Sequence, residues 1–253
     1  MNSATTNKPE LTRDLFLGEK LILWQDAEGY RAGIDPILLA AFNMPKRSER
    51  ILDLGCGVGA VSLCLLIKNP QVFIMGLEIL KETFELAKLN AAENNLVDNF
   101  VPVLGSVSNI PPIIKMGSFD LVVSNPPYTM AKTTNLSPYA KKQIAHVETQ
   151  ANIEIWVKTA SVVLKHKGLF SFIHRADRLD HLLGALRPFF GGITIHPLWP
   201  KSGKQAKRVL IKAKKGSKAP TVLTSGTIIH MNDGSYTPEV ASILKGNSLL
   251  NFE

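Results

Sequence analysis

Short, continuously apolar runs alternate along this chain with segments of helical periodicity, and this alternation limits the possible folds more than any other feature. Between the runs, apolar residues recur at helical spacing, as at Leu80, Phe84 and Ala87. Strands that are apolar on both faces and joined by amphipathic helices indicate a parallel sheet covered on both sides. The sequence therefore predicts an α/β fold with a doubly wound, mostly parallel sheet. The expected strands lie at residues 50–53, 72–76, 100–104, 119–124 and 168–174.

Two later strand-like runs, residues 194–198 and 208–212, have no helical pattern between them. Strands joined by a short connection pair in antiparallel fashion, so we expect an antiparallel hairpin at the edge of the sheet. Near the N-terminus, Leu21–Trp24 is predicted to form a strand or hairpin with a turn at residues 26–29. A short helix is expected to follow from Pro36.

The composition fits a protein with one substantial core. The chain has 253 residues, of which 45% are apolar and 20% charged, and this excludes a disordered or fibrous protein. We expect three segments. These are an N-terminal strand or hairpin with a cover helix at residues 1–46, a central domain at 47–219 and a C-terminal appendage at 220–253.

Membrane and metal partners are not expected. No apolar run approaches the roughly 20 residues that a bilayer-spanning helix needs. Cys56 and Cys64 are the only cysteines, and neither forms a CxxC or Cys/His pattern, so the ligands of a zinc site and a disulfide framework are both missing. The sequence thus predicts a soluble protein of the reducing cytoplasm.

The net charge of +8 comes from one segment, residues 201–218, which holds eight Lys and Arg residues and no acid. Such a stretch attracts polyanions, because each neutralised phosphate releases counterions. A solvated strand and turn that keeps the protein soluble would carry the same charge. Composition alone leaves the two interpretations open.

A glycine-rich turn, Asp53-Leu54-Gly55-Cys56-Gly57-Val58-Gly59-Ala60, follows the first predicted strand. Glycines let the backbone turn sharply and let a ligand approach the N-terminus of the next helix. The spacing matches both the dinucleotide pattern G-x-G-x-x-G/A and the form D-x-G-x-G-x-G. Glu78 ends the second strand, where a carboxylate can accept both hydroxyls of a ribose. The predicted ligand-binding residues are Asp53, Gly55, Cys56, Gly57, Gly59 and Glu78.

The tetrapeptide Asn125-Pro126-Pro127-Tyr128 follows the fourth predicted strand. A turn that ends the strand is its simplest interpretation. Together with the glycine turn, however, it resembles the class I S-adenosylmethionine-dependent methyltransferases, and within them the amino-group methylases that carry N-P-P-[YF]. The resemblance covers about residues 30–215. It implies a Rossmann-like fold, S-adenosylmethionine as cofactor, S-adenosylhomocysteine as product and no metal.

The tetrapeptide has a chemical rationale. An exocyclic amine or amide nitrogen is a poor nucleophile because its lone pair is delocalised. If the Asn125 side-chain oxygen and the Pro126 carbonyl each accept one N–H bond, the nitrogen is held part-way to tetrahedral and its lone pair is directed at the methyl donor. Tyr128 offers a face for stacking a planar group. The predicted catalytic residues are Asn125, Pro126, Pro127 and Tyr128.

Residues 30–39 are similar to the segment before the glycine turn in the bacterial tRNA(Val) adenine-N6 methyltransferase family, which modifies an anticodon-loop adenine. The resemblance implies that Asp35 belongs to a segment that covers the cofactor, whereas a helix N-cap before Pro36 is the simpler role for this residue. Many relatives have an acid after the third strand that contacts the cofactor adenine. This chain has Ser106 there, so Ser106 is the predicted cofactor contact at that position.

The resemblance makes N6 methylation of an adenine in tRNA the leading hypothesis. Glutamine-N5 methylation of a protein and guanine-N2 methylation of RNA use similar chemistry and stay open, as do an NAD-dependent oxidoreductase and a non-catalytic RNA-binding module. The sequence does not predict an oligomeric state. The candidate substrate-binding residues are Lys132 and Lys141 in the loop after the tetrapeptide, with Lys204, Lys207 and Arg208 in the basic segment.

Overall fold

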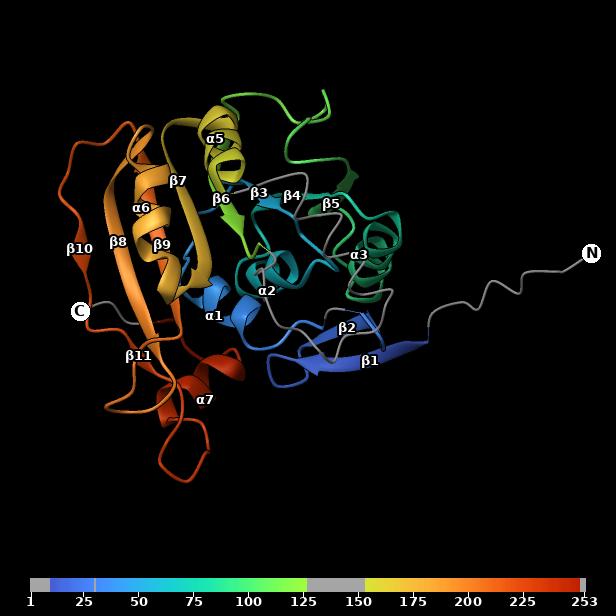
Figure 1. The fold of residues 1–253 in the computed structure, drawn as a ribbon. Helices are drawn as coiled ribbons and strands as arrows, with labels where there is room; N and C mark the ends of the chain where they lie inside the picture. Colours follow the sequence, from blue (N-terminus) through green and yellow to red (C-terminus); the bar gives the residue numbers. More distant parts are fainter. Residues whose placement is uncertain (1–9, 30, 127–152, 251–253) are drawn as a thin grey trace, which may run out of the picture.

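A nine-stranded sheet forms the centre of the computed structural model, which describes residues 10–29, 31–126 and 153–250 (Figure 1). The strand order is β10-β8-β9-β7-β6-β3-β4-β5, and β11 also pairs with β8. The strands are β3 (Arg50–Leu54), β4 (Phe73–Glu78), β5 (Phe100–Leu104), β6 (Phe119–Ser124), β7 (Leu164–Arg175), β8 (Phe190–Trp199), β9 (Arg208–Lys215), β10 (Val222–Leu223) and β11 (Thr227–Ile228).

Five neighbouring strands of the sheet run parallel, in the order β7, β6, β3, β4 and β5. Strand β9 runs antiparallel to both β7 and β8. The predicted doubly wound, mostly parallel sheet is therefore confirmed, and so is the antiparallel hairpin. The hairpin is not the outermost part of the sheet, because β10 and β11 extend it beyond β8 in parallel orientation.

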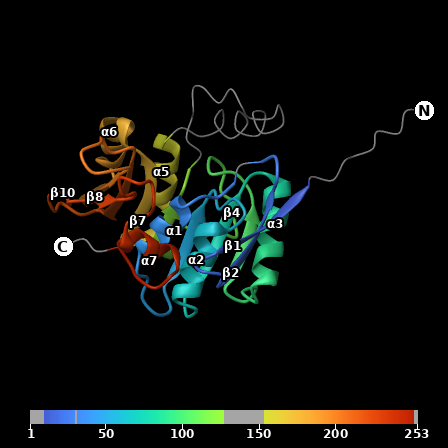
Figure 2. The same cartoon turned by 90° about the horizontal axis from the view of Figure 1, so that it is seen from below.

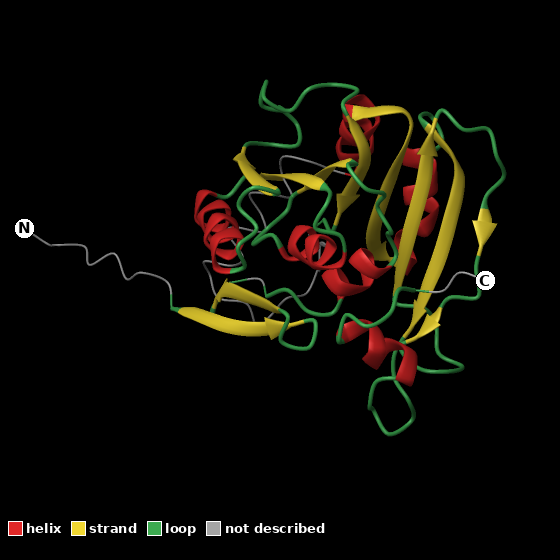
Figure 3. Ribbon diagram, turned by 180° about the vertical axis from the view of Figure 1, so that it is seen from behind, coloured by secondary structure: helices red, strands yellow, loops and turns green. Residues whose placement is uncertain are grey.

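Helices cover both faces of the sheet (Figures 1 and 3). Ile51 and Leu52 are neighbours on β3 and are both fully buried, but they belong to two different core clusters, one on each face. This is why the strands are apolar without alternation. The helices of the first cluster are α1 (Asp35–Ala41), α2 (Ala60–Lys68), α3 (Lys81–Glu93) and α7 (Pro238–Leu244), and those of the second are α5 (Ile153–Val163) and α6 (Leu179–Leu186), which the short helix η1 (Ala176–Arg178) precedes.

The N-terminal strands β1 (Leu11–Phe16) and β2 (Leu21–Asp26) form a separate antiparallel hairpin beside α2 and α3 (Figure 2). The turn that joins the two strands lies at residues 17–20, so the turn predicted at 26–29 is not the hairpin turn. Leu17, Gly18 and Glu19 all adopt the left-handed conformation that reverses the chain there. The bend at 26–29 exists, with the Glu28 N–H donating to the Asp26 carboxylate, but it only ends β2.

The outer segments of the chain pack onto the central one. The C-terminal helix α7 contacts α1, and β10 and β11 pair with β8. The proposed division at residues 46 and 219 stays a prediction. Within the part of the chain that the structure describes, no helix is long and apolar enough to cross a membrane.

Candidate active site

The carboxyl ends of three neighbouring strands meet at one edge of the central sheet. In the ladder, Leu54 of β3 lies beside Leu77 of β4 and Ser124 of β6. Adjacent strands are about 4.8 Å apart, so the next residues of β4 and β6 flank the start of the glycine turn. These three residues are Gly55, Glu78 and Asn125.

Gly55 and Gly57 have different surroundings within the turn. Both have left-handed backbones, with φ of +65° and +57°. A side chain on Gly55 would overlap the ring of Trp156, whereas a Cβ on Gly57 would meet no atom of the described residues within 4 Å. Gly59 is also left-handed, and a Cβ there would lie 2.7 Å from Phe100. Gly55 and Gly59 thus allow close packing, and among the described residues Gly57 leaves space for a ligand to approach the backbone.

The Glu78 carboxylate holds the glycine turn in place. Its Oε2 accepts the N–H of Gly57 at 3.0 Å, and its Oε1 accepts the N–H of Leu80 at 2.8 Å. The backbone of Ile79 also donates to this carboxylate, which has about four acceptor positions in all, so about one remains for a ligand. Burial raises the pKa of Glu78, although these backbone donors oppose the shift.

Asp53 lies buried beneath the turn, with 1% of its surface exposed. Its Oδ2 accepts the Ser62 hydroxyl at 2.7 Å, and its Oδ1 has no hydrogen-bond partner among the described residues. Burial raises the pKa of Asp53 to about 7, and the negative charge of Glu78 adds to the shift. Two buried carboxyl groups with raised pKa values favour a ligand that carries positive charge near them.

Cys56 and Ser106 occupy the same edge with their polar groups engaged locally. The backbone N–H of Cys56 donates to Leu77 O at 3.0 Å, and burial raises the pKa of its thiol well above the usual value. The thiol is therefore neutral and is not a nucleophile. Ser106 follows β5, and its hydroxyl lies 2.8 Å from the Ser108 hydroxyl in a local turn.

The first half of the predicted tetrapeptide continues β6 at this edge. The Ser124 hydroxyl donates to Leu54 O at 2.9 Å and ties the ends of β6 and β3 together. Asn125 is half-buried and Pro126 is buried. The remaining predicted residues of this region, Pro127, Tyr128, Lys132 and Lys141, lie outside the described residues.

Asp35 does not cap helix α1, so the N-cap prediction is wrong. The helix begins at Asp35 itself, and its N-cap residue is Ile34, whose side chain makes no capping hydrogen bond. The Asp35 carboxylate instead lies 2.8 Å from Nε of Arg208, with 7% of the Asp35 side chain and 42% of the Arg208 side chain exposed. The ion pair joins the start of α1 to the start of β9. Whether Asp35 also covers the cofactor stays a prediction.

The basic segment is not one surface, because β9 divides it between two edges of the sheet. Arg208 pairs with Arg175 at the carboxyl end of β7, so Lys204 and Lys207, which are exposed, lie toward the edge of the glycine turn. Lys214 lies at the opposite end of β9. Between them, the Lys212 ammonium donates to Phe42 O at 2.6 Å, and burial lowers its pKa to about 8.

Two supporting residues had no signal in the sequence. Ser62 of α2 donates to Asp53, and the buried Asn90 of α3 donates to Val58 O in the glycine turn at 2.9 Å. Both occupy ordinary helix positions, and only the packing of the helices against the turn brings them there.

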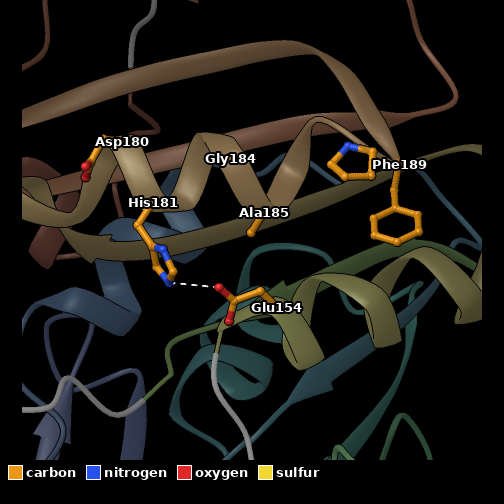
Figure 4. Close-up of a pocket in the computed structure, with 7 residues that line it drawn as sticks. Glu154, Asp180, His181, Gly184, Ala185 and Phe189 are labelled. Carbon is orange, nitrogen blue, oxygen red and sulfur yellow. Dashed lines mark ion pairs between the residues drawn. The ribbon is translucent and has the colours of Figure 1, made fainter.

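A separate open pocket of about 510 Å³ lies between α5 and α6 (Figure 4). His181 Nε2 lies 3.0 Å from Glu154 Oε1 at its mouth. No predicted site residue is among those that line it. Across the described residues, no cluster of three or more His, Cys, Asp or Glu side chains could hold a metal ion.

Known proteins resemble this chain in sequence and fold. The family model of the methyltransferase small domain matches residues 34–176. The tRNA1(Val) (adenine(37)-N6)-methyltransferase of Porphyromonas gingivalis is 30% identical, covering 89% of this chain and 91% of its own length. That of Dyadobacter fermentans is 25% identical, covering 91% of this chain and 95% of its own.

Solved structures share the fold. A predicted O-methyltransferase of Agrobacterium tumefaciens superposes with a TM-score of 0.71 at 24% identity, over 85% of this chain and 98% of its own. TYW2 of M. jannaschii, in complex with AdoMet, superposes with a TM-score of 0.57 at 14% identity, over 82% of this chain and 87% of its own. The chain therefore belongs to the methyltransferase small domain family and, within it, to the family of the tRNA1(Val) (adenine(37)-N6)-methyltransferases.

Proposed function

We propose that this methyltransferase transfers a methyl group from S-adenosylmethionine to the exocyclic N6 amine of an adenine in tRNA. One observation carries the proposal: Asn125 and Pro126 follow β6 directly beside the glycine turn of β3 and across from Glu78. A cofactor at the turn and an amine at Asn125 would thus be neighbours. The substrate named for the Porphyromonas and Dyadobacter relatives supports adenine in tRNA.

The residues around the turn fit S-adenosylmethionine. Gly57 leaves space for close approach, Glu78 keeps an acceptor position for a ribose hydroxyl, and the buried carboxyl of Asp53 favours a cationic ligand. When bound, this cofactor supplies a methyl group on a positively charged sulfur. The full set proposed to hold it is Asp35, Asp53, Gly55, Cys56, Gly57, Gly59, Glu78 and Ser106.

The chain itself supplies orientation rather than acid–base chemistry. The Asn125 side-chain oxygen and the Pro126 carbonyl would each accept one N–H of the target amine and hold its lone pair toward the methyl donor. The same two oxygens lie where positive charge develops on the nitrogen. Pro126 suits the position because its φ is fixed and it has no N–H of its own to compete. The proposed catalytic residues also include Pro127 and Tyr128. The ring of Tyr128 would stack on the base.

Lys204 and Lys207 are suited to contact RNA phosphates, because they are exposed and lie on the edge of the sheet that carries the glycine turn. Arg208 would contribute less to phosphate binding than predicted, since its guanidinium already pairs with Asp35. Lys132 and Lys141 stay candidate substrate contacts. A target adenine in a folded loop must leave its stack to reach Asn125. An RNA substrate also agrees with the predicted cytoplasmic location.

The test is methylation of total small RNA from cells that lack the enzyme, with a labelled methyl donor and nucleoside mass spectrometry. We expect N6-methyladenosine in one tRNA. Label in N2-methylguanosine would refute the adenine assignment, and so would unlabelled RNA with label in a glutamine amide when protein from the same cells is the acceptor. Calorimetry separates the cofactor classes, because S-adenosylhomocysteine should bind and NAD should not.

The Asn125→Ala variant tests the mechanism. It removes the acceptor for the amine but no residue of the glycine turn, so methyl transfer should fall by at least about a thousandfold. The affinity for S-adenosylhomocysteine, measured by calorimetry, should stay within about threefold of wild type. An Asn125→Ala enzyme with near-normal turnover would contradict the proposed role.

A further inference from the structure

Asn90 joins two parts of the molecule through one side chain. It lies on α3 and is fully buried. Its Oδ1 accepts the N–H of Trp24 at 2.7 Å, and its Nδ2 donates to Trp24 O at 3.0 Å and to Val58 O at 2.9 Å. A side-chain amide has two N–H donors, so both are used. One donor reaches strand β2 of the N-terminal hairpin, and the other reaches the glycine turn.

Asn94, one helical turn later, repeats only half of this arrangement. Its Oδ1 accepts the N–H of Ile22 at 2.9 Å, and its Nδ2 donates to Ile22 O at 2.7 Å. The Asn94 Nδ2 also donates at 2.7 Å to the carbonyl of Asn90, within α3 itself. Asn90 and Asn94 are four residues apart and lie on one face of the helix, and Ile22 and Trp24 are two residues apart and lie on one side of the strand. The two amides therefore hydrogen-bond to the edge of β2. Only Asn90 continues to the glycine turn.

The contact with Val58 is placed where it can affect a ligand. Val58 lies between Gly59 and Gly57, and no atom in the described ranges would lie within 4 Å of a Cβ on Gly57. Glycines have the widest backbone freedom, so this part of the turn has little stiffness of its own. On the other side, the Glu78 carboxylate holds the N–H of Gly57 at 3.0 Å. Glu78 and Asn90 thus hold the turn at two successive residues, one by an N–H and the other by a carbonyl.

We infer that Asn90 is a positioning residue, which couples the docking of the N-terminal hairpin to the shape of the glycine turn and so to cofactor affinity. The inference rests on the proposed function, in which the turn holds S-adenosylmethionine. A turn that is already ordered loses less conformational freedom when the cofactor binds. The coupling is reciprocal, so a bound cofactor stabilises the docked hairpin by the same amount.

The matched variants Asn90→Asp and Asn94→Asp separate this coupling from simple docking. Each keeps the acceptor for an N–H of β2 and replaces an amide donor with oxygen. Each removes one hydrogen bond to β2 while the other contacts keep the hairpin docked, so the variants differ in the contact between Asn90 and Val58 O. Only Asn90→Asp should raise the dissociation constant of S-adenosylhomocysteine in calorimetry, by about tenfold or more, while Asn94→Asp stays within about twofold. In the methylation assay, Asn90→Asp should raise KM for S-adenosylmethionine and leave kcat and KM for RNA unchanged.

Hydrogen exchange gives a readout that needs no catalysis. Adding S-adenosylhomocysteine should slow exchange of the Trp24 N–H in the wild type and in Asn94→Asp, but not in Asn90→Asp. If Asn90→Asp does not fold, the pair Asn90→Ala and Asn94→Ala is compared in the same way. Equal affinities in the two variants, or ligand protection of Trp24 that persists without the Asn90 amide, would overturn the inference. A wild-type protein that does not bind S-adenosylhomocysteine would refute the proposed function and this inference with it.

Discussion

Gly55 and Gly57 are two residues apart in one turn, but alanine should affect different properties at the two positions. Gly55→Ala should mainly lower stability, and Gly57→Ala should mainly weaken cofactor binding. Both have φ near +60°. An L-residue in this conformation costs about 1–2 kcal/mol, so both variants should lose that much stability. The difference lies in the space around each Cβ.

The Cβ of Gly55→Ala would overlap the ring of Trp156, which is 4% exposed and lies in the core between the sheet and α5. Overpacking a well-packed core costs about 1–3 kcal/mol. The total loss in the free energy of unfolding is then about 2–5 kcal/mol. The Cβ of Gly57→Ala meets no atom of the described part of the chain within 4 Å, so only the backbone cost is expected. It would, however, occupy the space proposed for the cofactor.

Urea denaturation and calorimetry with S-adenosylhomocysteine measure the two effects separately. Gly55→Ala should lower the denaturation midpoint more than Gly57→Ala, by the equivalent of about 1–3 kcal/mol. Gly57→Ala should weaken binding by more than about tenfold while the protein stays folded. Equal losses of stability in the two variants, or normal binding by Gly57→Ala, would show that the space around the turn has been misassigned.

Two further predictions concern charge. Burial raises the pKa of Asp53 to about 7. Between about pH 4 and pH 7, the folded protein therefore holds a proton on Asp53 that the unfolded chain has lost. Because of this difference, the free energy of unfolding should fall as the pH rises through this range. Asp53→Asn should remove this fall in urea midpoints measured across that range, and a pH-independent difference between the two proteins would contradict the assignment. Reversing the charges of Lys204 and Lys207 to glutamate should weaken RNA binding and reduce the slope of log affinity against log salt by about 1–2. The matched control reverses the charges of Lys214 and Lys218, which belong to the same basic segment but follow the other end of β9, away from the glycine turn. An equal effect of the two pairs would mean that the charge acts non-specifically.

Local patterns in the sequence were sufficient for the architecture and for the edge at which the site lies. Continuous apolar strands occur when both faces of a sheet are covered, and Ile51 and Leu52 do bury into two separate cores. Strands joined by helices run parallel, so the ends of β3, β4 and β6 have to meet. A glycine turn, an acid and an Asn-Pro pair that each follow a strand could therefore be expected at one edge before any coordinates were known.

Local sequence patterns do not predict a contact whose partner is remote in sequence. Asp35 before Pro36 has the local signature of a helix cap, but its carboxylate pairs with Arg208 on β9. The basic segment is continuous in sequence, yet a strand of eight residues carries its two halves to opposite edges of the sheet. The hairpin turn was misplaced because the Asp26 signal is genuine but belongs to a bend after β2.

Sequence alone thus determined the five parallel strands, their burial on both faces and which chemical groups lie at the carboxyl edge, because each of these depends on neighbours within a few residues. Only the tertiary structure decided that Asn90 reaches Val58, that Gly57 faces space while Gly55 faces Trp156, and that Lys212 donates to Phe42 O. Periodicity specifies the face a side chain occupies. The atom across from it depends on how distant elements pack.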